Sequence, residues 1–367
     1  MSTIQTNAIV DASGGNTATV NGHNITSSNM MGRNLIINGS MIIDQRNKGS
    51  SITPTNNSLT LDRWKSGAAQ TSKFSLDQDS ESPAGFNTSM KVTSLTAYTP
   101  SSNDHFFIEQ EVEGYNTIPL ALGSSDAKDI SISFWVRSSL TGTFAGSVIN
   151  SARNRSRVFE YTINTANTWE HKTVSFVGDT TGTWLTTNGK GVSLRFNFGA
   201  AGTWLQNAGS WSTGNVTASS GSVNLVATNN ATLYLTGVQL EVGKTSTDFE
   251  HRSYGEELAL CQRYLQVISG GSDAYTFSGK CQGASSIDAT IPLSVSLRAS
   301  PTMNSINSRT FHDAGYSASS STTPTTVHYQ DNNVHLAINC AGFSGLTNNE
   351  ISVWGPLASE LLINAEL

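Results

Sequence analysis

Apolar and polar residues alternate in several runs along the middle of the chain, and this pattern constrains the fold more than any other feature. A period of two over five or more residues indicates a β-strand with one buried face. No helical stretch separates the runs, which predicts an antiparallel sandwich or barrel. Residues 33–252 have about the length of one large jelly-roll β-sandwich. The runs are residues 130–136, 158–163, 173–177, 192–198 and 231–242.

Shorter alternating runs continue to the end of the chain and predict a second, smaller β-sandwich over residues 269–367. We expect its last strand within the final eight residues, 360–367. Residues 317–326 are almost all Ser and Thr, which favours a low-complexity loop. The other runs in this part are residues 275–277, 287–291, 295–297, 327–329, 334–338 and 351–354.

One helix is predicted between the two β regions, within residues 253–268. Ser253 and Glu256 have the spacing of a capping box, in which each side chain accepts a hydrogen bond from the other residue's backbone. Leu258 and Cys261 then begin an apolar stripe at helical spacing. The chain is therefore expected to be all-β, an antiparallel jelly roll and a smaller sandwich joined by one connecting helix.

The first 32 residues carry too few apolar side chains to bury a core of their own. The Asn21-Gly22 pair favours a tight turn between two short strands. We expect this segment to dock on a larger assembly through its apolar residues, which are Ile4, Ile9, Val10, Val20 and Ile25.

Composition and charge exclude several classes of protein. Charged residues make up 13% of the chain and the net charge is −6, with no Lys/Arg cluster of the kind that binds nucleic acid. No apolar run is long enough for a membrane-spanning helix, and the first residues lack the features of a secretory signal. We expect a protein made in a cytoplasm. Its three cysteines, Cys261, Cys281 and Cys340, fit no zinc pattern; a Cys281–Cys340 disulfide stays open, but buried thiols are favoured.

No catalytic motif stands out in the sequence, which predicts a protein that is not an enzyme. The densest acidic run is Glu109, Glu111 and Glu113, which share one face of a strand. Such a face suits calcium binding or catalysis by paired carboxylates. The favoured interpretation is the solvated side of an edge strand, where like charges discourage pairing with another chain.

Four tryptophans lie in a region rich in Gly, Thr and Asn, and two of them end Gly-Thr-Trp runs typical of loops. An indole on a loop can stack on a sugar ring while nearby amides and hydroxyls bind the sugar hydroxyls. The alternative is that each indole closes the end of the sandwich core. The candidate glycan-binding residues are Trp169, Trp184, Trp204 and Trp211.

Three runs, taken in order, resemble tail-fibre and appendage proteins of bacteriophages, particularly marine phages. The opening Asn34-Leu-Ile-Ile-Asn-Gly39 resembles the first strand of a carbohydrate-binding-module jelly roll, and Gln239-Leu-Glu-Val-Gly243 resembles its last. Leu61-Asp-Arg-Trp64 lies between them, and the resemblance covers roughly residues 1–266. It implies a homotrimeric virion protein, attached to a phage tail through residues 1–32 and contacting host surface glycans through its distal β domains.

The resemblance also implies a structural calcium ion between the first and last strands, with Asn38 and Glu241 as its candidate ligands; no other cofactor is expected. Two other functions stay open. One is a head fibre that decorates the capsid through residues 1–32, and the other is a secreted glycan-binding module or depolymerase.

Overall fold

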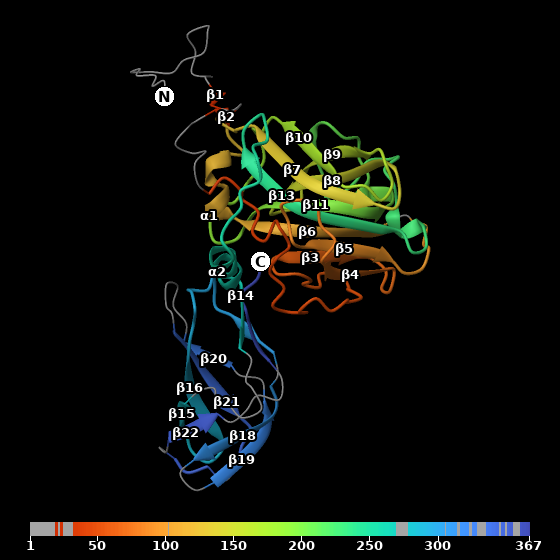
Figure 1. The fold of residues 1–367 in the computed structure, drawn as a ribbon. Helices are drawn as coiled ribbons and strands as arrows, with labels where there is room; N and C mark the ends of the chain where they lie inside the picture. Colours follow the sequence, from red (N-terminus) through yellow and green to blue (C-terminus); the bar gives the residue numbers. More distant parts are fainter. Residues whose placement is uncertain are drawn as a thin grey trace, which may run out of the picture.

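The computed structural model describes residues 19–20, 23–24, 32–101, 103–268, 278–304, 306–313, 316–322, 325–328, 335–344, 346–348, 351–354 and 360–367. Its strands confirm the all-β class, and a jelly-roll-like sandwich occupies the larger part of the chain (Figure 1). Among the described residues, no helix is long and apolar enough to cross a membrane.

The sandwich consists of two antiparallel sheets. The five-stranded sheet has the order β10-β7-β13-β5-β4, and the six-stranded sheet has the order β12-β9-β8-β11-β6-β3. The first contains β4 (Phe74–Asp79), β5 (Ser89–Ser94), β7 (Ile130–Ser138), β10 (Glu170–Phe176) and β13 (Thr232–Val242). The second contains β3 (Trp64–Ala68), β6 (His105–Glu113), β8 (Gly142–Asn150), β9 (Arg155–Ile163), β11 (Lys190–Ala200) and β12 (Trp211–Thr213).

Alternating apolar residues from both sheets fill the core between them, as the period of two predicts. Phe134 of β7 and Phe196 of β11 meet there with ring centroids 4.9 Å apart. Trp64 of β3 is fully buried in the same core. All five alternating runs in residues 130–242 therefore form strands with one face in this core, and the other face of each sheet is left for different chemistry.

Strand β6 is not at the edge of its sheet, which corrects the favoured interpretation of its acidic face. It pairs with β11 on one side and with β3 on the other. The carboxylates of Glu109, Glu111 and Glu113 are buried instead of solvated. Period two correctly placed the three acids on one face, but sequence alone did not reveal the basic side chains that the neighbouring strands supply.

The connecting helix α2 (Tyr254–Gln262) begins at the predicted cap, where Ser253 Oγ accepts a hydrogen bond from the Glu256 amide over 3.3 Å. The helix is shorter than expected, because residues 265–268 form strand β14 (Leu265–Ile268). The structure has one other α-helix among the described residues, the single turn α1 (Gly114–Thr117), followed by the 3-10 helix η2 (Ile118–Leu120).

The motifs that carry the resemblance meet at this helix. The Asn38 side chain donates to the Asp62 carbonyl over 3.0 Å, and the Trp64 indole donates to the Asn38 carbonyl over 3.2 Å. The Asn38 amide donates to Glu257 of α2. Residues 33–36 form no strand, although Leu35 donates its amide to the Leu240 carbonyl of β13. These motifs therefore join the sandwich to the helix.

The strands from β14 onward form two further sheets, as the smaller sandwich requires. A three-stranded sheet has the order β14-β23-β17, and a seven-stranded sheet has the order β19-β18-β22-β15-β16-β21-β20. Apolar side chains from both sheets share one core, in which Ile363 of β23 and Ile338 of β21 are buried. The strands are β15 (Ser278–Cys281), β16 (Ser286–Pro292), β17 (Thr302–Met303), β18 (Ile306–Asp313), β19 (Tyr316–Thr322), β20 (Thr325–His328), β21 (His335–Ala341), β22 (Ile351–Trp354) and β23 (Leu361–Asn364).

Two expectations for this region were wrong. The Ser/Thr-rich stretch is not a loop, since β19 and the start of β20 occupy most of it and pair with β18 and β21. The Ser/Thr-rich stretch can form strands because backbone pairing with a neighbouring strand does not need apolar side chains, and Thr suits a pleated surface. The second error is that residues 295–297 form no strand. Strand β23 confirms the expected terminal strand.

The predicted hairpin near the N-terminus is present, with β1 (Thr19–Val20) paired to β2 (His23–Asn24). The other candidate docking residues, Ile4, Ile9, Val10 and Ile25, lie outside the described residues.

None of the three cysteines forms a disulfide, and all are buried. Cys281 pairs with Ile287, which also pairs with Cys340. The two cysteines are thus two strands apart, about 9–10 Å between Cα atoms, whereas a disulfide needs less than about 7 Å.

Candidate functional site

A row of charged residues crosses the outer face of the six-stranded sheet. Lys65 of β3 lies opposite Glu109 of β6, and Glu109 lies opposite Arg195 of β11. Glu111 follows two residues along β6 and therefore shares this face. The inward residues of the same strands, such as Ile108 and Phe196, belong to the core. Alternation thus gives one strand an apolar inner face and a charged outer face.

Each carboxylate in this row contacts several basic groups. Glu109 accepts from Arg195 Nε over 2.8 Å and from Arg153 Nη2 over 2.9 Å. Glu111 lies 2.8 Å from Lys65 Nζ, 2.6 Å from Lys190 Nζ and 3.1 Å from Arg153 Nη2. The carboxylates are 1% and 3% exposed, while Arg153 and Lys190 are 29% and 32% exposed. The acids therefore lie beneath Arg153 and Lys190, and these two basic side chains face the solvent.

Local backbone features place the two exposed basic residues. Arg153 has a φ of 55° in the turn between β8 and β9, a left-handed conformation that costs a non-glycine residue about 1–2 kcal/mol. The buried Asn150 side chain holds this turn by accepting from the amides of Asn154 and Arg155. Lys190 begins β11 just before a bulge, an irregularity that changes the direction in which nearby side chains point.

Aromatic side chains form the other end of the same face. The Trp204 ring, in the 3-10 helix η3 (Gly202–Trp204), packs against His105 with centroids 4.0 Å apart and the ring planes tilted by 33°. The Phe107 ring follows His105, and the Arg195 guanidinium lies 4.2 Å from its centroid. Burial lowers the pKa of His105 below its ordinary value, which favours a neutral ring at pH 7. Gly67 leaves room for Phe107, because a Cβ there would lie 2.3 Å from the ring.

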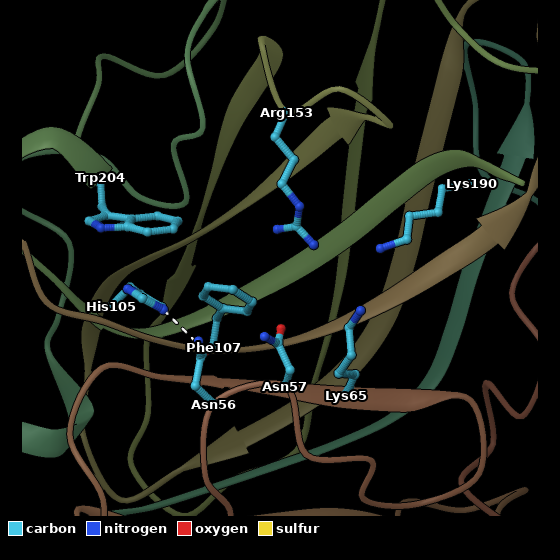
Figure 2. Close-up of a pocket in the computed structure, with 8 residues that line it drawn as sticks. All are labelled: Asn56, Asn57, Lys65, His105, Phe107, Arg153, Lys190 and Trp204. Carbon is cyan, nitrogen blue, oxygen red and sulfur yellow. Dashed lines mark hydrogen bonds between the residues drawn. The ribbon is translucent and has the colours of Figure 1, made fainter. Parts of the chain in front are cut away.

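Between these two ends is an open pocket of about 460 Å³. Figure 2 shows Trp204 and His105 at one end, and Arg153, Lys190 and Lys65 pointing toward one another at the other. Asn56 reaches the aromatic end, where its side-chain oxygen lies 3.4 Å from His105 Nε2. The lining residues are Asn56, Asn57, Lys65, His105, Phe107, Arg153, Lys190 and Trp204. We call this the β6 pocket.

The four candidate tryptophans do not share one site. Trp204 lines the β6 pocket. Trp184 and Trp211 pack edge to face with centroids 5.4 Å apart and contact the core, and Trp211 donates to the Val177 carbonyl over 2.8 Å. Trp169 packs against Tyr234 of the five-stranded sheet. All four indoles are half-buried, so each combines a packing role with some exposed surface.

The side chains of Asn38 and Glu241 do not fit the calcium site that the resemblance implies. Asn38 Oδ1 accepts from the Ile43 amide over 2.9 Å. Glu241 accepts from the Thr247 amide over 2.7 Å and from the Thr247 hydroxyl over 2.8 Å. Calcium requires six to eight oxygen ligands. Among the described residues, no group of three or more His, Cys, Asp or Glu side chains is arranged to hold a metal ion.

Sequence reasoning missed most of the β6 pocket. Of its lining residues only Trp204 was a candidate for glycan binding. A signal was present, because His105, Phe107, Glu109 and Glu111 alternate on one strand and place aromatic and acidic groups on the same face. The contributions of Asn57 and Lys190 come from distant segments, and no local pattern marks them.

The fold and the site together define an antiparallel β-sandwich with a polar and aromatic pocket on the outer face of one sheet. No protein-family model matches the chain, and no curated protein matches it either. The sandwich is similar to solved carbohydrate-related structures at low identity. One is a putative sugar-binding protein from Bacteroides thetaiotaomicron, with 10% identity, 57% of this chain and 100% of that chain covered, and a TM-score of 0.35.

Two further similar structures are the carbohydrate-binding module TmCBM61 in complex with β-1,4-galactotriose and the enzymatically active domain of bacteriophage CBA120 tailspike protein 4. The module has 11% identity, with 57% of this chain and 99% of the module covered and a TM-score of 0.30. The tailspike has 12% identity, with 57% of this chain but only 21% of the tailspike chain covered and a TM-score of 0.31. All three TM-scores are below 0.5.

Proposed function

We propose that this protein binds glycans without cleaving them and that the β6 pocket is its binding site. The observation that carries the proposal is the pocket itself, where the Trp204 ring lies at one end and amide and amine donors line the rest. Sugars present apolar C–H faces together with many hydroxyls. An aromatic ring beside hydrogen-bonding side chains suits both parts of such a ligand.

The arrangement of the acids supports binding instead of hydrolysis. A glycosidase uses two carboxyl groups on either side of the scissile bond, one of which donates a proton. Here every oxygen of Glu109 and Glu111 contacts a Lys or Arg side chain. A sugar in the pocket would meet Lys65, Arg153 and Lys190 before either carboxylate. Sustained release of reducing ends from a bound polysaccharide would contradict the non-enzymatic part of the proposal.

Comparing the binding of the full chain and of its Trp204→Ala variant to a glycan array tests the site. Removing the indole should weaken binding about tenfold or more, because stacking area is lost. Trp169→Ala is the matched control, since Trp169 is also half-buried but lies against Tyr234 outside the pocket. Equal effects of the two substitutions, or no effect of Trp204→Ala, would contradict the assignment.

The wider proposal is that the protein is a homotrimeric virion component that serves as a phage tail fibre. Support comes from the resemblance over residues 1–266 and from the small N-terminal hairpin, β1 paired with β2, which belongs to neither sandwich sheet. Residues 1–32 would attach to the particle and the distal β domains would contact host glycans. Antibody labelling of particles in electron micrographs tests the location, and sedimentation analysis tests the trimer. Labelling of the capsid would favour the head-fibre alternative.

A further inference from the structure

The charges around the β6 pocket do not balance. Two carboxylates, Glu109 and Glu111, contact four basic side chains, which leaves a formal surplus of two positive charges. The chain as a whole carries a net charge of −6, so this surplus opposes the overall charge of the protein. The basic residues are Lys65, Arg153, Lys190 and Arg195.

The surplus is also directed at the pocket. Lys65, Arg153 and Lys190 all line it, whereas the two carboxylates and the fully buried Arg195 lie beneath. A further acid, Asp104, precedes His105 at the aromatic end. Its carboxylate accepts hydrogen bonds from Tyr98 and Ser101, so it is already occupied. A ligand therefore meets positive charge at one end and rings at the other.

The exposed basic groups keep donors for a ligand. Among the described residues, the carboxylates engage Arg153 only through Nη2, which leaves Nη1 and Nε to face other partners. Lys190 contacts a single carboxylate oxygen and has three N–H donors. Neutralising two buried carboxylates needs only two cations. All four basic side chains share these two carboxylates, so two of the positive charges are not neutralised within the described part of the site.

Resting on the proposed function, we propose that the β6 pocket selects an acidic saccharide, a sugar that carries a carboxylate, sulfate or phosphate group. The anionic group would bind Arg153 and Lys190, with Lys65 beneath them, and the ring of the same or the adjacent sugar would pack on Trp204. Hydrogen bonds between charged groups are stronger than neutral ones, and Arg and Lys are the usual partners of oxyanions.

A glycan array with matched pairs tests this inference. Each pair holds an acidic glycan and its neutral form: an oligogalacturonate and its carboxyl-reduced product, and sulfated and phosphorylated oligosaccharides with their desulfated and dephosphorylated forms. We expect the full chain to bind acidic members about tenfold or more tightly than their neutral partners. The class of anion that binds identifies the oxyanion.

Lys190→Gln should abolish most of this preference, because it removes one surplus charge and leaves Glu111 in contact with Lys65 and Arg153. Lys91→Gln is the matched control. Lys91 is 28% exposed and paired with Asp79, but it lies on the five-stranded sheet.

Three outcomes separate this inference from the proposed function. Preference for acidic glycans that Lys190→Gln abolishes and Lys91→Gln preserves supports it. Trp204-dependent binding with no acidic preference overturns the inference and leaves the proposed function standing. Binding to no glycan, or binding that neither Trp204→Ala nor Lys190→Gln weakens, overturns both. Equal loss of acidic binding in Lys190→Gln and Lys91→Gln indicates attraction to any polyanion and also overturns the inference.

Discussion

The Trp204 ring packs against His105 with ring centroids 4.0 Å apart, although His105 begins strand β6 and Trp204 belongs to a turn far along the chain. The turn is held in place because the Trp204 carbonyl accepts from the amides of Thr217 and Ala218. The aromatic end of the pocket is therefore fixed by backbone hydrogen bonds that involve no ligand. Preorganisation of this kind lowers the entropy lost on binding.

Gly67→Ala should weaken glycan binding solely because it displaces the Phe107 ring. The new Cβ would lie 2.3 Å from the Phe107 ring, so the ring must move out toward the pocket. We expect a loss of about 1–3 kcal/mol in the free energy of unfolding, together with weaker glycan binding. Thermal melts and titration calorimetry measure the two effects.

Gly255→Ala is the control for this substitution, because a Cβ there meets nothing within 4 Å. Combining Gly67→Ala with Phe107→Ala should recover part of the stability that each single change costs. Additive losses in the double variant would mean that the ring is not the group displaced.

Asp62→Asn should alter the pH dependence of stability. Burial raises the pKa of the Asp62 carboxyl to about 6, against the opposing hydrogen bonds from Gln45 and the charge of Arg46. Since the folded-state pKa is above the unfolded value, the folded state holds the proton more tightly. Asp62 thus contributes stability at pH below about 4, and this contribution is lost as the pH rises through about 6.

The amide that Asp62→Asn introduces does not titrate, so the difference in unfolding free energy between wild type and variant should change by about 2–3 kcal/mol between pH 4 and pH 7. Urea unfolding at four pH values across that range measures it. A constant difference across the range would contradict the raised pKa.

The buried cysteines should be inert in the folded protein. Burial raises the pKa of Cys340 to about 12 and raises that of Cys261 in the same direction. The thiolate is the reactive form, so alkylation at pH 8 should be slow while the protein is folded and complete after denaturation. Mass spectrometry of native and denatured samples measures the extent of alkylation. Rapid labelling of Cys340 in the native protein would contradict the prediction.

Arg298→Ala should loosen the attachment between the two parts of the molecule. The guanidinium donates to the carbonyl of Asn188 over 2.6 Å, to that of Ala365 over 3.0 Å and to that of Glu366 over 3.2 Å. Losing these hydrogen bonds should cost about 2 kcal/mol and accelerate amide exchange in residues 361–366.

Arg137→Ala is the comparison for that change, because the Arg137 Nε donates to the single carbonyl of Asn167. It should leave exchange in residues 361–366 unchanged. Equal protection of these residues in wild type and Arg298→Ala would show that other contacts hold them.

The sequence predicted those parts of the fold that depend on local pattern. Residues 192–198 alternate, and β11 has the expected inner face, with Phe196 in the core. The capping box at Ser253 correctly predicted where α2 begins. Residues 316–322 lack apolar alternation, so the pairing of β19 with β18 left no trace in the sequence. Pairing between strands is decided by tertiary context as much as by composition.

The candidate site was less predictable, because its residues meet only through the sheet register. Glu109 and Arg195 lie opposite each other, and nothing near either residue indicates its partner. The basic residues around Glu109 belong to β3, β11 and the turn before β9, and they come together only when these strands pair. Trp204 was found because an indole in a Gly-rich loop is a local feature, whereas Lys190 depends on a bulge that one sequence does not reveal.

The paired strands β14 and β23 give the junction a mechanical property. The chain leaves the sandwich through α2 and β14, and it returns through β23 to bring Glu366 against Arg63 and Arg46 (Figure 1). Tension applied at the far sheets would therefore be divided between the covalent chain through β14 and the ion pairs of Glu366, which follows β23. Such a double connection resists twisting better than a single tether, so the two parts of the molecule would keep their relative orientation under load.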